Sequence, residues 1–152
     1  MSFMNIDYVL LRQICVLSLF FGALCGLVTL IPFIGTLSFI FLICFMAPLV
    51  LWVLIKYNCL SLTSIKDSII NGAIVGFVSY IGFSVIFLPI SVILVKVFHI
   101  ASNMGIGLML QNANFFILVV LSIFMGVLSA TVNAFTGFLT FYVIEFVNSF
   151  KK

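Results

Sequence analysis

The chain has 152 residues, of which 66% are hydrophobic and only 6% are charged, and its mean hydropathy is +1.51. Soluble domains carry about 25% charged residues, so this composition excludes a soluble globular protein and predicts an integral membrane protein. The net charge of +3 is accounted for by basic residues beside membrane spans, and no nucleic-acid partner is expected.

Four apolar stretches are long enough to cross a bilayer as helices, which takes about 20 residues. They predict one all-α transmembrane domain over residues 1–152, with spans at about 13–31, 37–55, 68–95 and 115–149. The last stretch contains no proline, and it favours one long tilted helix over a helix broken near Gly137. The spans are expected to pair as two helical hairpins.

Proline, glycine and helix-capping residues indicate the connections between the spans and one bend. Pro32 and Gly35 predict a tight turn between the first two spans. Pro48 lacks an N–H group, so it predicts a bend in the second span near Ala47. Ser64 stands three residues before Asp67, which resembles the capping pattern at the start of a helix.

The basic residues predict the orientation, because short cytoplasmic loops are enriched in Lys and Arg. One side of the predicted bundle receives five of the six, namely Arg12, Lys56, Lys66, Lys151 and Lys152. Only Lys96 falls on the other side. Both termini are therefore expected in the cytoplasm, and the location is expected to be a plasma or inner membrane.

Two apolar stretches resemble each other closely. Residues 22–31 and 72–81 carry Gly, Ala, Gly, Val and Ile at matching positions, and both run in the same direction through the membrane. Glycines four residues apart lie on one helix face and allow close backbone approach. This pattern predicts an internal repeat in which Gly22 or Gly26 meets Gly72 or Gly76.

Polar side chains inside the spans are the next candidates, because an amide or hydroxyl in hydrocarbon needs a partner. Asn133 lies among small residues at helical spacing, which predicts a packing face on the fourth span formed by Gly126, Ala130 and Gly137. We expect Asn133 to bond to another helix. The alternative is a polar path for an ion or small solute, lined by Asn71, Tyr80 and Asn133.

The sequence offers no catalytic, cofactor-binding or metal-binding set. No ionisable residue falls at the expected middle of a span, which argues against proton-coupled transport. The four cysteines have no CxxC spacing, the only histidine is His99, and the span serines have no matched base.

These patterns predict a non-enzymatic, multi-pass membrane protein that acts through helix–helix contacts. Besides the lipid bilayer, its expected partners are further copies of itself or another membrane protein, as a homo-oligomer or an accessory subunit. The alternative function is a small channel or facilitator for an ion or small solute.

Overall fold

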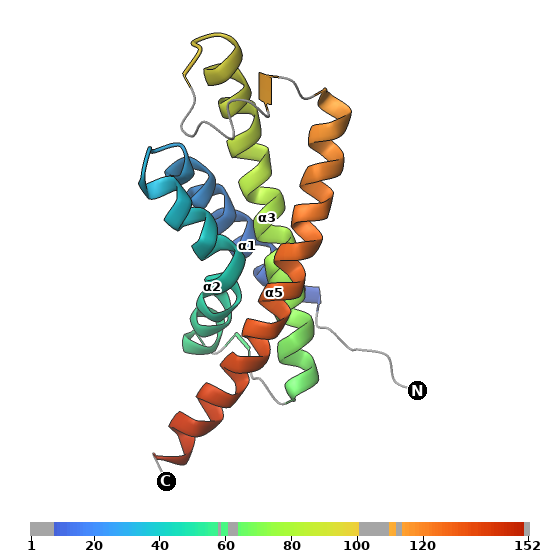
Figure 1. Ribbon diagram of the computed structural model, residues 1–152. Coiled ribbons are helices and arrows are strands. Elements are labelled where there is room, and N and C mark those ends of the chain that lie inside the picture. The colour runs from blue at the N-terminus through green and yellow to red at the C-terminus, as the bar shows by residue number, and fades with distance from the viewer. Residues whose placement is uncertain (1–7, 58, 61–63, 101–109, 112–113, 151–152) are drawn as a thin grey trace.

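A computed structural model describes residues 8–57, 59–60, 64–100, 110–111 and 114–150. Within these ranges the long elements are all helices, and there are four: α1 Tyr8–Thr29, α2 Ile34–Lys56, α3 Ile65–Lys96 and α5 Phe115–Ser149 (Figure 1). Each is long and apolar enough to cross a membrane. The predicted all-helical class with four apolar helices is therefore confirmed.

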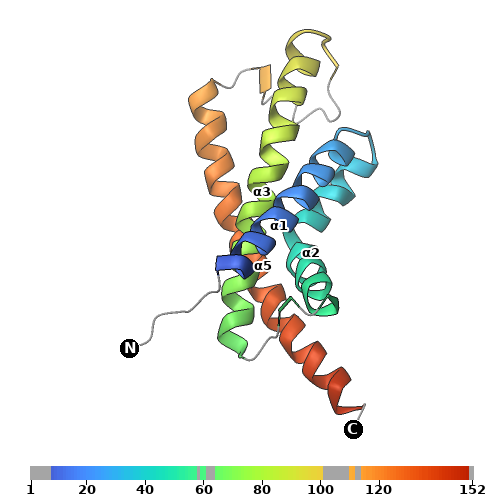
Figure 2. The same ribbon diagram turned by 180° about the vertical axis from the view of Figure 1, so that it is seen from behind.

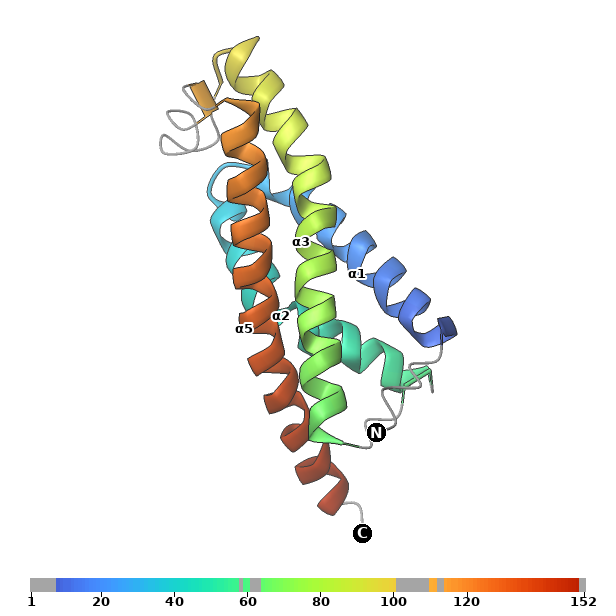
Figure 3. The ribbon, with the colours of Figure 1, turned by 90° about the vertical axis from the view of Figure 1, so that its right-hand side faces the viewer.

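Helix α3 is the centre of the bundle. It packs against α1, α2 and α5, whereas α1 and α5 make no contact with each other in the described part of the chain. Helices α3 and α5 run side by side in opposite directions (Figure 3), and α1 crosses α3 on the far side from the view of Figure 1 (Figure 2). The beginning of α1 and the end of α5 lie toward the same end of the bundle.

A tight turn joins α1 to α2. The Ile34 amide donates to the Pro32 carbonyl and the Gly35 amide donates to the Ile31 carbonyl, both at 2.9 Å. Phe33 holds a positive φ of 68° and is 96% exposed. Gly35 lies so close to the Thr29 carbonyl that a Cβ atom would not fit. The turn closes within these few residues, so α2 begins earlier than the predicted 37.

Helix α2 bends in its middle (Figure 3), and Pro48 lies inside it. Proline removes one backbone donor and crowds the preceding turn, which is the usual origin of a sharp kink. Helix α3 begins with the expected cap, since the Ser64 hydroxyl accepts from the Asp67 amide at 3.2 Å. Pro89 lies inside α3, and the helix continues past it to Lys96.

The two longest helices exceed the thickness of a bilayer core. At 1.5 Å per residue, α3 with 32 residues is about 48 Å long and α5 with 35 residues is about 52 Å long. The hydrocarbon core is about 30 Å thick, so both helices must tilt or project. Helix α5 is continuous through Gly137 and extends past the other helices at its C-terminal end (Figures 1 and 3). Lys151 and Lys152 lie outside the described residues.

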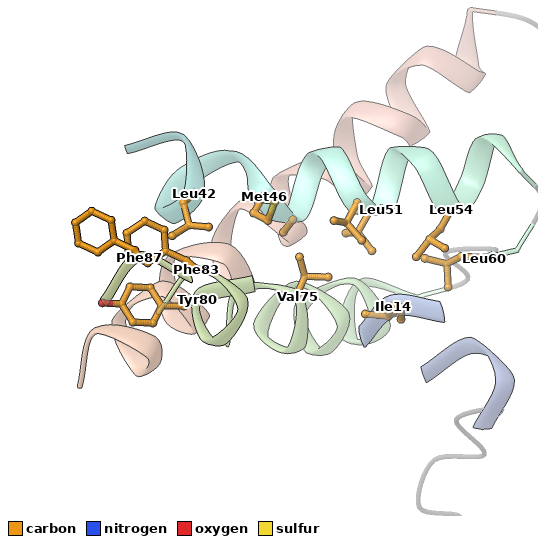
Figure 4. Packing of buried hydrophobic residues seen from close by; sticks show 12 residues of the cluster. Ile14, Leu42, Met46, Leu51, Leu54, Leu60, Val75, Tyr80, Phe83 and Phe87 are labelled. Carbon is orange, nitrogen blue, oxygen red and sulfur yellow. The ribbon is translucent and has the colours of Figure 1, made fainter. Parts of the chain in front are cut away.

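The apolar core is formed mainly between α2 and α3. Leu42, Met46 and Leu51 of α2 are completely buried and face α3 (Figure 4). Val75, also completely buried, and Phe83, 3% exposed, stand opposite them on α3. This cluster fills the middle of the bundle.

The glycines of α1 and α3 do not meet as expected. Helix α1 carries Gly22 and Gly26, and helix α3 carries Gly72 and Gly76. Gly22 instead packs against the backbone of Ser79 on α3, while Gly76 faces Ser129 on α5. Helix α3 therefore uses one small-residue face for α1 and another for α5. The two similar stretches occupy different environments, since Gly22 and Gly26 pack against α3, whereas residues 72–81 contact α5 through Gly72 and Gly76 and contact α1 through Ser79.

The glycine contacts generate a paired test. A Cβ atom at Gly76 would lie 2.5 Å from the Ser129 carbonyl oxygen, so Gly76→Ala must force two backbones apart. A Cβ atom at Gly126 would meet only the rings of Phe77, at 3.3 Å, and Tyr80, at 3.5 Å, and a ring can move. We expect Gly76→Ala to lower the free energy of unfolding by about 1–3 kcal/mol.

Gly126→Ala is the matched control, because it makes the same change in a helix interior, where alanine is intrinsically preferred by about 1 kcal/mol. It should leave stability unchanged or raise it. Denaturation of both variants in mixed micelles measures the difference. Equal effects of the two substitutions would contradict the assigned packing.

Candidate functional site

The most extensive helix contact is a seam between α3 and α5. On α3 it consists of Ser68, Gly72 and Gly76, spaced by four residues. The Ser68 hydroxyl donates to the Gly137 carbonyl at 2.6 Å, and the Ser129 hydroxyl donates to the Gly76 carbonyl at 3.0 Å. Each helix thus contributes one serine donor and one glycine carbonyl, in an approximately two-fold arrangement.

Glycine makes these hydroxyl bonds possible because it removes the side chain between the backbones. Gly72 lies against the backbone of Asn133 and of Gly137. A Cβ atom on Gly137 would lie 2.7 Å from the Ser68 carbonyl oxygen. Short serine side chains can reach a neighbouring carbonyl only at such separations, and small residues have this role at membrane helix interfaces. The seam therefore combines van der Waals contact with two interhelical hydrogen bonds.

Asn133 connects this seam to α2. Its side chain is completely buried. Its Oδ1 accepts from the Ala47 amide at 2.7 Å, and its Nδ2 donates to the Ile43 carbonyl at 2.8 Å. The same Nδ2 donates to the Ser129 carbonyl at 3.0 Å and makes a longer contact with the Leu42 carbonyl at 3.3 Å. Both ends of the amide are thus satisfied by backbone.

The two main partners of Asn133 on α2, the Ala47 amide and the Ile43 carbonyl, stand four residues apart. In an uninterrupted helix the amide of residue 47 donates to the carbonyl of residue 43. The side chain of Asn133 bridges this same N–H and C=O. Pro48 is the next residue and has no N–H to offer the preceding turn. Asn133 therefore supplies hydrogen bonds where the backbone ladder of α2 is weakest.

The structure separates the residues of the predicted polar path. Asn71 and Tyr80 are 9 positions apart on α3, which is about two and a half turns, so their side chains leave the helix on opposite sides. Both are 7% exposed. Asn133 is engaged by α2 and by its own helix. The three side chains do not form a continuous polar lining.

The small residues predicted on α5 have different surroundings. Ala130 lies beside Gly76, and Gly137 lies beside Gly72. Gly126 contacts the rings of Phe77 and Tyr80 rather than a backbone. The seam therefore does not extend along α5 as far as Gly126.

Sequence reasoning missed the part played by two serines in this seam. Ser68 and Ser129 are completely buried and bond across the helix pair. The signal was available in the repeated spacing Ser-x3-Gly-x3-Gly at 68–76 and Ser-x3-Asn-x3-Gly at 129–137. Periodicity alone, however, does not say which helix a hydroxyl will face.

Most other buried hydroxyls bond to helix carbonyls. Ser18 donates to Ile14 at 2.6 Å within α1, and Ser38 donates from α2 to the Cys25 carbonyl of α1 at 3.1 Å. Among the described residues, the Ser91 hydroxyl oxygen is buried without a hydrogen-bond partner, whereas the buried Ser84 hydroxyl lies next to the Tyr80 hydroxyl. Both belong to the half of α3 beyond the seam.

The described ranges contain no group of three His, Cys, Asp or Glu residues that could hold a metal ion. The site is therefore a hydrogen-bonded helix junction whose donors and acceptors are amide, hydroxyl and backbone groups. Comparison with protein-family models, with curated proteins and with solved structures finds no match to this chain.

The position of Asn133 beside Pro48 predicts energetic coupling between the two residues. Asn133→Ala removes the bridge to α2 and should lower the free energy of unfolding by about 1–2 kcal/mol, given that single interhelical bonds in membranes contribute about 0.6 and at most about 1.7 kcal/mol. In a Pro48→Ala background α2 can straighten and pair residues 43 and 47 by itself. The same Asn133→Ala change should then cost less than half as much.

A double-mutant cycle measures this coupling. Thr131→Ala is the control, because Thr131 is exposed and its hydroxyl donates only to the Val127 carbonyl of its own helix. It should have little effect in either background. Asn133→Ala costs that are equal with and without Pro48 would refute the bridge.

Proposed function

We propose that this chain is a non-enzymatic, multi-pass membrane protein that acts through helix–helix contacts, as a homo-oligomer or as an accessory subunit of a membrane complex. The Asn133 junction is the observation that carries the proposal. The one fully buried amide in the described spans joins three helices, through α2, α5 and the adjacent Gly76 of α3. Such a junction suits a fixed scaffold better than a conducting path.

The surface of α5 supports a role in contacts with other helices. Phe116, Phe124 and Phe135 are between 61% and 75% exposed along its outer side. The C-terminal end of this helix also leaves the bundle, with Phe146 63% exposed. Aromatic side chains provide large contact areas. We propose this side of α5 as the contact surface for another membrane helix.

The channel or facilitator remains the second candidate function, and it depends on a polar lining through the bundle. Asn71 and Tyr80 point to opposite sides of α3, and the Asn133 amide is already bonded. A solute path through these residues would require breaking the junction with α2. The scaffold function requires no such rearrangement.

We further propose that the helices form two hairpins, α1 with α2 and α3 with α5, with both termini in the cytoplasm of a cell bounded by a plasma or inner membrane. The positive-inside rule supports this orientation. The Lys56 ammonium lies 5.1 Å from the centre of the Trp52 ring, an arrangement suited to a membrane interface. The internal repeat is proposed as a trace of duplication, with its two copies now packed differently.

The orientation predicts that the one exposed cysteine among the described residues faces the cytoplasm. Cys59 is exposed between α2 and α3, whereas Cys15, Cys25 and Cys44 lie within helices that would be in the membrane. A membrane-impermeant thiol reagent should therefore label Cys59 only after the cells are lysed.

Ile100 provides the matched control, because it is 59% exposed near the opposite end of α3. In a Cys59→Ser background, Ile100→Cys should react in intact cells. Labelling of Cys59 before lysis would reverse the proposed orientation.

Reconstitution tests the function itself. Purified protein in liposomes should give no ion or small-solute flux above that of empty liposomes, because the Asn133 amide is occupied by bonds to α2 and to its own helix. Purification in mild detergent should yield a defined complex, containing either several copies or a stoichiometric partner. Replacing Phe116, Phe124 and Phe135 together with Ala should dissociate it.

The contrary result is a selective flux from the wild-type protein that Asn133→Ala alters. That outcome would favour the channel and overturn the scaffold. A strictly monomeric protein with no partner would also contradict it.

A further inference from the structure

The turn between α1 and α2 stops well short of the ends of the neighbouring helices. Gly26 of α1 packs against Phe83 of α3, and both helices run toward the turn. Thr29, the last residue of α1, is therefore about level with Ile86. Helix α3 continues ten residues past Ile86 to Lys96, which is about 15 Å along its axis. Helix α5 also reaches past the turn (Figures 1 and 3).

The turn carries no charge and presents apolar side chains outward. The 43 residues from Gln13 to Ile55 include no Asp, Glu, Lys, Arg or His. Phe33 at the tip is 96% exposed, and the flanking Ile31, Ile34 and Leu37 are 48%, 50% and 69% exposed. A continuous apolar patch of this kind marks a surface that contacts lipid or another protein.

The backbone of the turn is closed on itself. Residues 30–35 have five N–H groups, because Pro32 has none. Four of the five donate to carbonyls two to four residues earlier, at 2.9 to 3.2 Å, namely those of Leu30, Ile31, Ile34 and Gly35. Within this described turn only the Phe33 N–H makes no such bond. Irregular backbone is costly in lipid because its polar groups lack partners, and this turn removes most of that cost.

The conformation of Phe33 also favours an apolar surrounding. Its φ of 68° is uncommon for a bulky residue. At this position the aromatic ring lies outside the bundle, where it gains no contact that would offset the strain. Transfer of such a ring from water to hydrocarbon is favourable. A glycine would fit the backbone better, whereas a phenylalanine adds a large apolar group at the tip.

We propose that the α1–α2 turn is a lipid-binding surface that ends inside the bilayer, in the leaflet farther from the two termini. Its exposed side chains contact the upper acyl chains. The Phe33 N–H lies near the glycerol esters, whose carbonyl oxygens accept hydrogen bonds. Of the described helices, only α3 and α5 then reach water on that side. This inference goes beyond the proposed function and holds for either orientation of the chain.

Fluorescence quenching tests the depth of the turn. Trp52 is the only tryptophan, so Trp52→Phe gives a background into which Phe33→Trp places a single probe. The full-length protein is reconstituted in phosphatidylcholine liposomes, with iodide on both sides of the bilayer. Phe33→Trp should resist iodide. A phospholipid brominated near the headgroup end of its acyl chains should quench it strongly.

Phe98→Trp in the same background is the matched control. Phe98 is 61% exposed and stands two residues past Lys96, beyond the level of the turn. Iodide should quench this probe, and the brominated lipid should quench it less than Phe33→Trp. Leu37→Trp provides a second probe beside the turn, and it should behave like Phe33→Trp.

Two results would overturn the proposal. Equal iodide quenching of Phe33→Trp and Phe98→Trp would place the turn in water. Protection of Phe33→Trp from both iodide and brominated lipid would mean that protein covers the turn instead. Melting temperatures establish that each variant is folded, and if Phe33→Trp is not, Leu37→Trp decides between the same outcomes.

Discussion

The close approach of α3 to α5 is the constraint on which the other contacts depend. Hydrophobic side chains gain little by leaving lipid for one another, so membrane helices associate through packing and interhelical hydrogen bonds. Gly72, Gly76 and Gly137 bring the two backbones together, and Ser68 and Ser129 then reach carbonyls on the opposite helix. Without the glycines these hydroxyls would have no partner across the pair.

The same approach places Asn133 where it can reach α2. Its Cβ atom lies close to Gly76, and its amide extends to the backbone beside Pro48. A proline bend and a buried amide are each unfavourable alone, because one leaves backbone groups unpaired and the other needs partners in hydrocarbon. Together they satisfy each other. This mutual dependence joins the seam to the apolar core between α2 and α3.

Helices α3 and α5 separate beyond the seam (Figure 1), and this separation follows from a change in side-chain size. The seam residues are Gly, Ser and Ala, whereas Phe83, Phe87 and Leu88 continue α3 and Leu121 and Met125 occupy the facing part of α5. Bulky side chains hold helix axes farther apart, so the two helices cannot keep the separation set by the glycines. The closely packed half and the separated half of the bundle are therefore parts of the same helix pair.

The sequence by itself determined the helix content, the four apolar spans, the bend at Pro48 and the small-residue faces, because hydropathy and helical spacing are local properties. Tertiary structure decided which faces meet. Gly22 lies in the contact between α1 and α3, Gly76 lies in the contact between α3 and α5, and these two contacts are on different sides of α3. Periodicity assigns a residue to one side of its own helix but carries no information about the neighbouring helix. For the same reason Asn133 was identifiable as a residue that needs a partner, while its partner on α2 depended on the arrangement of three helices.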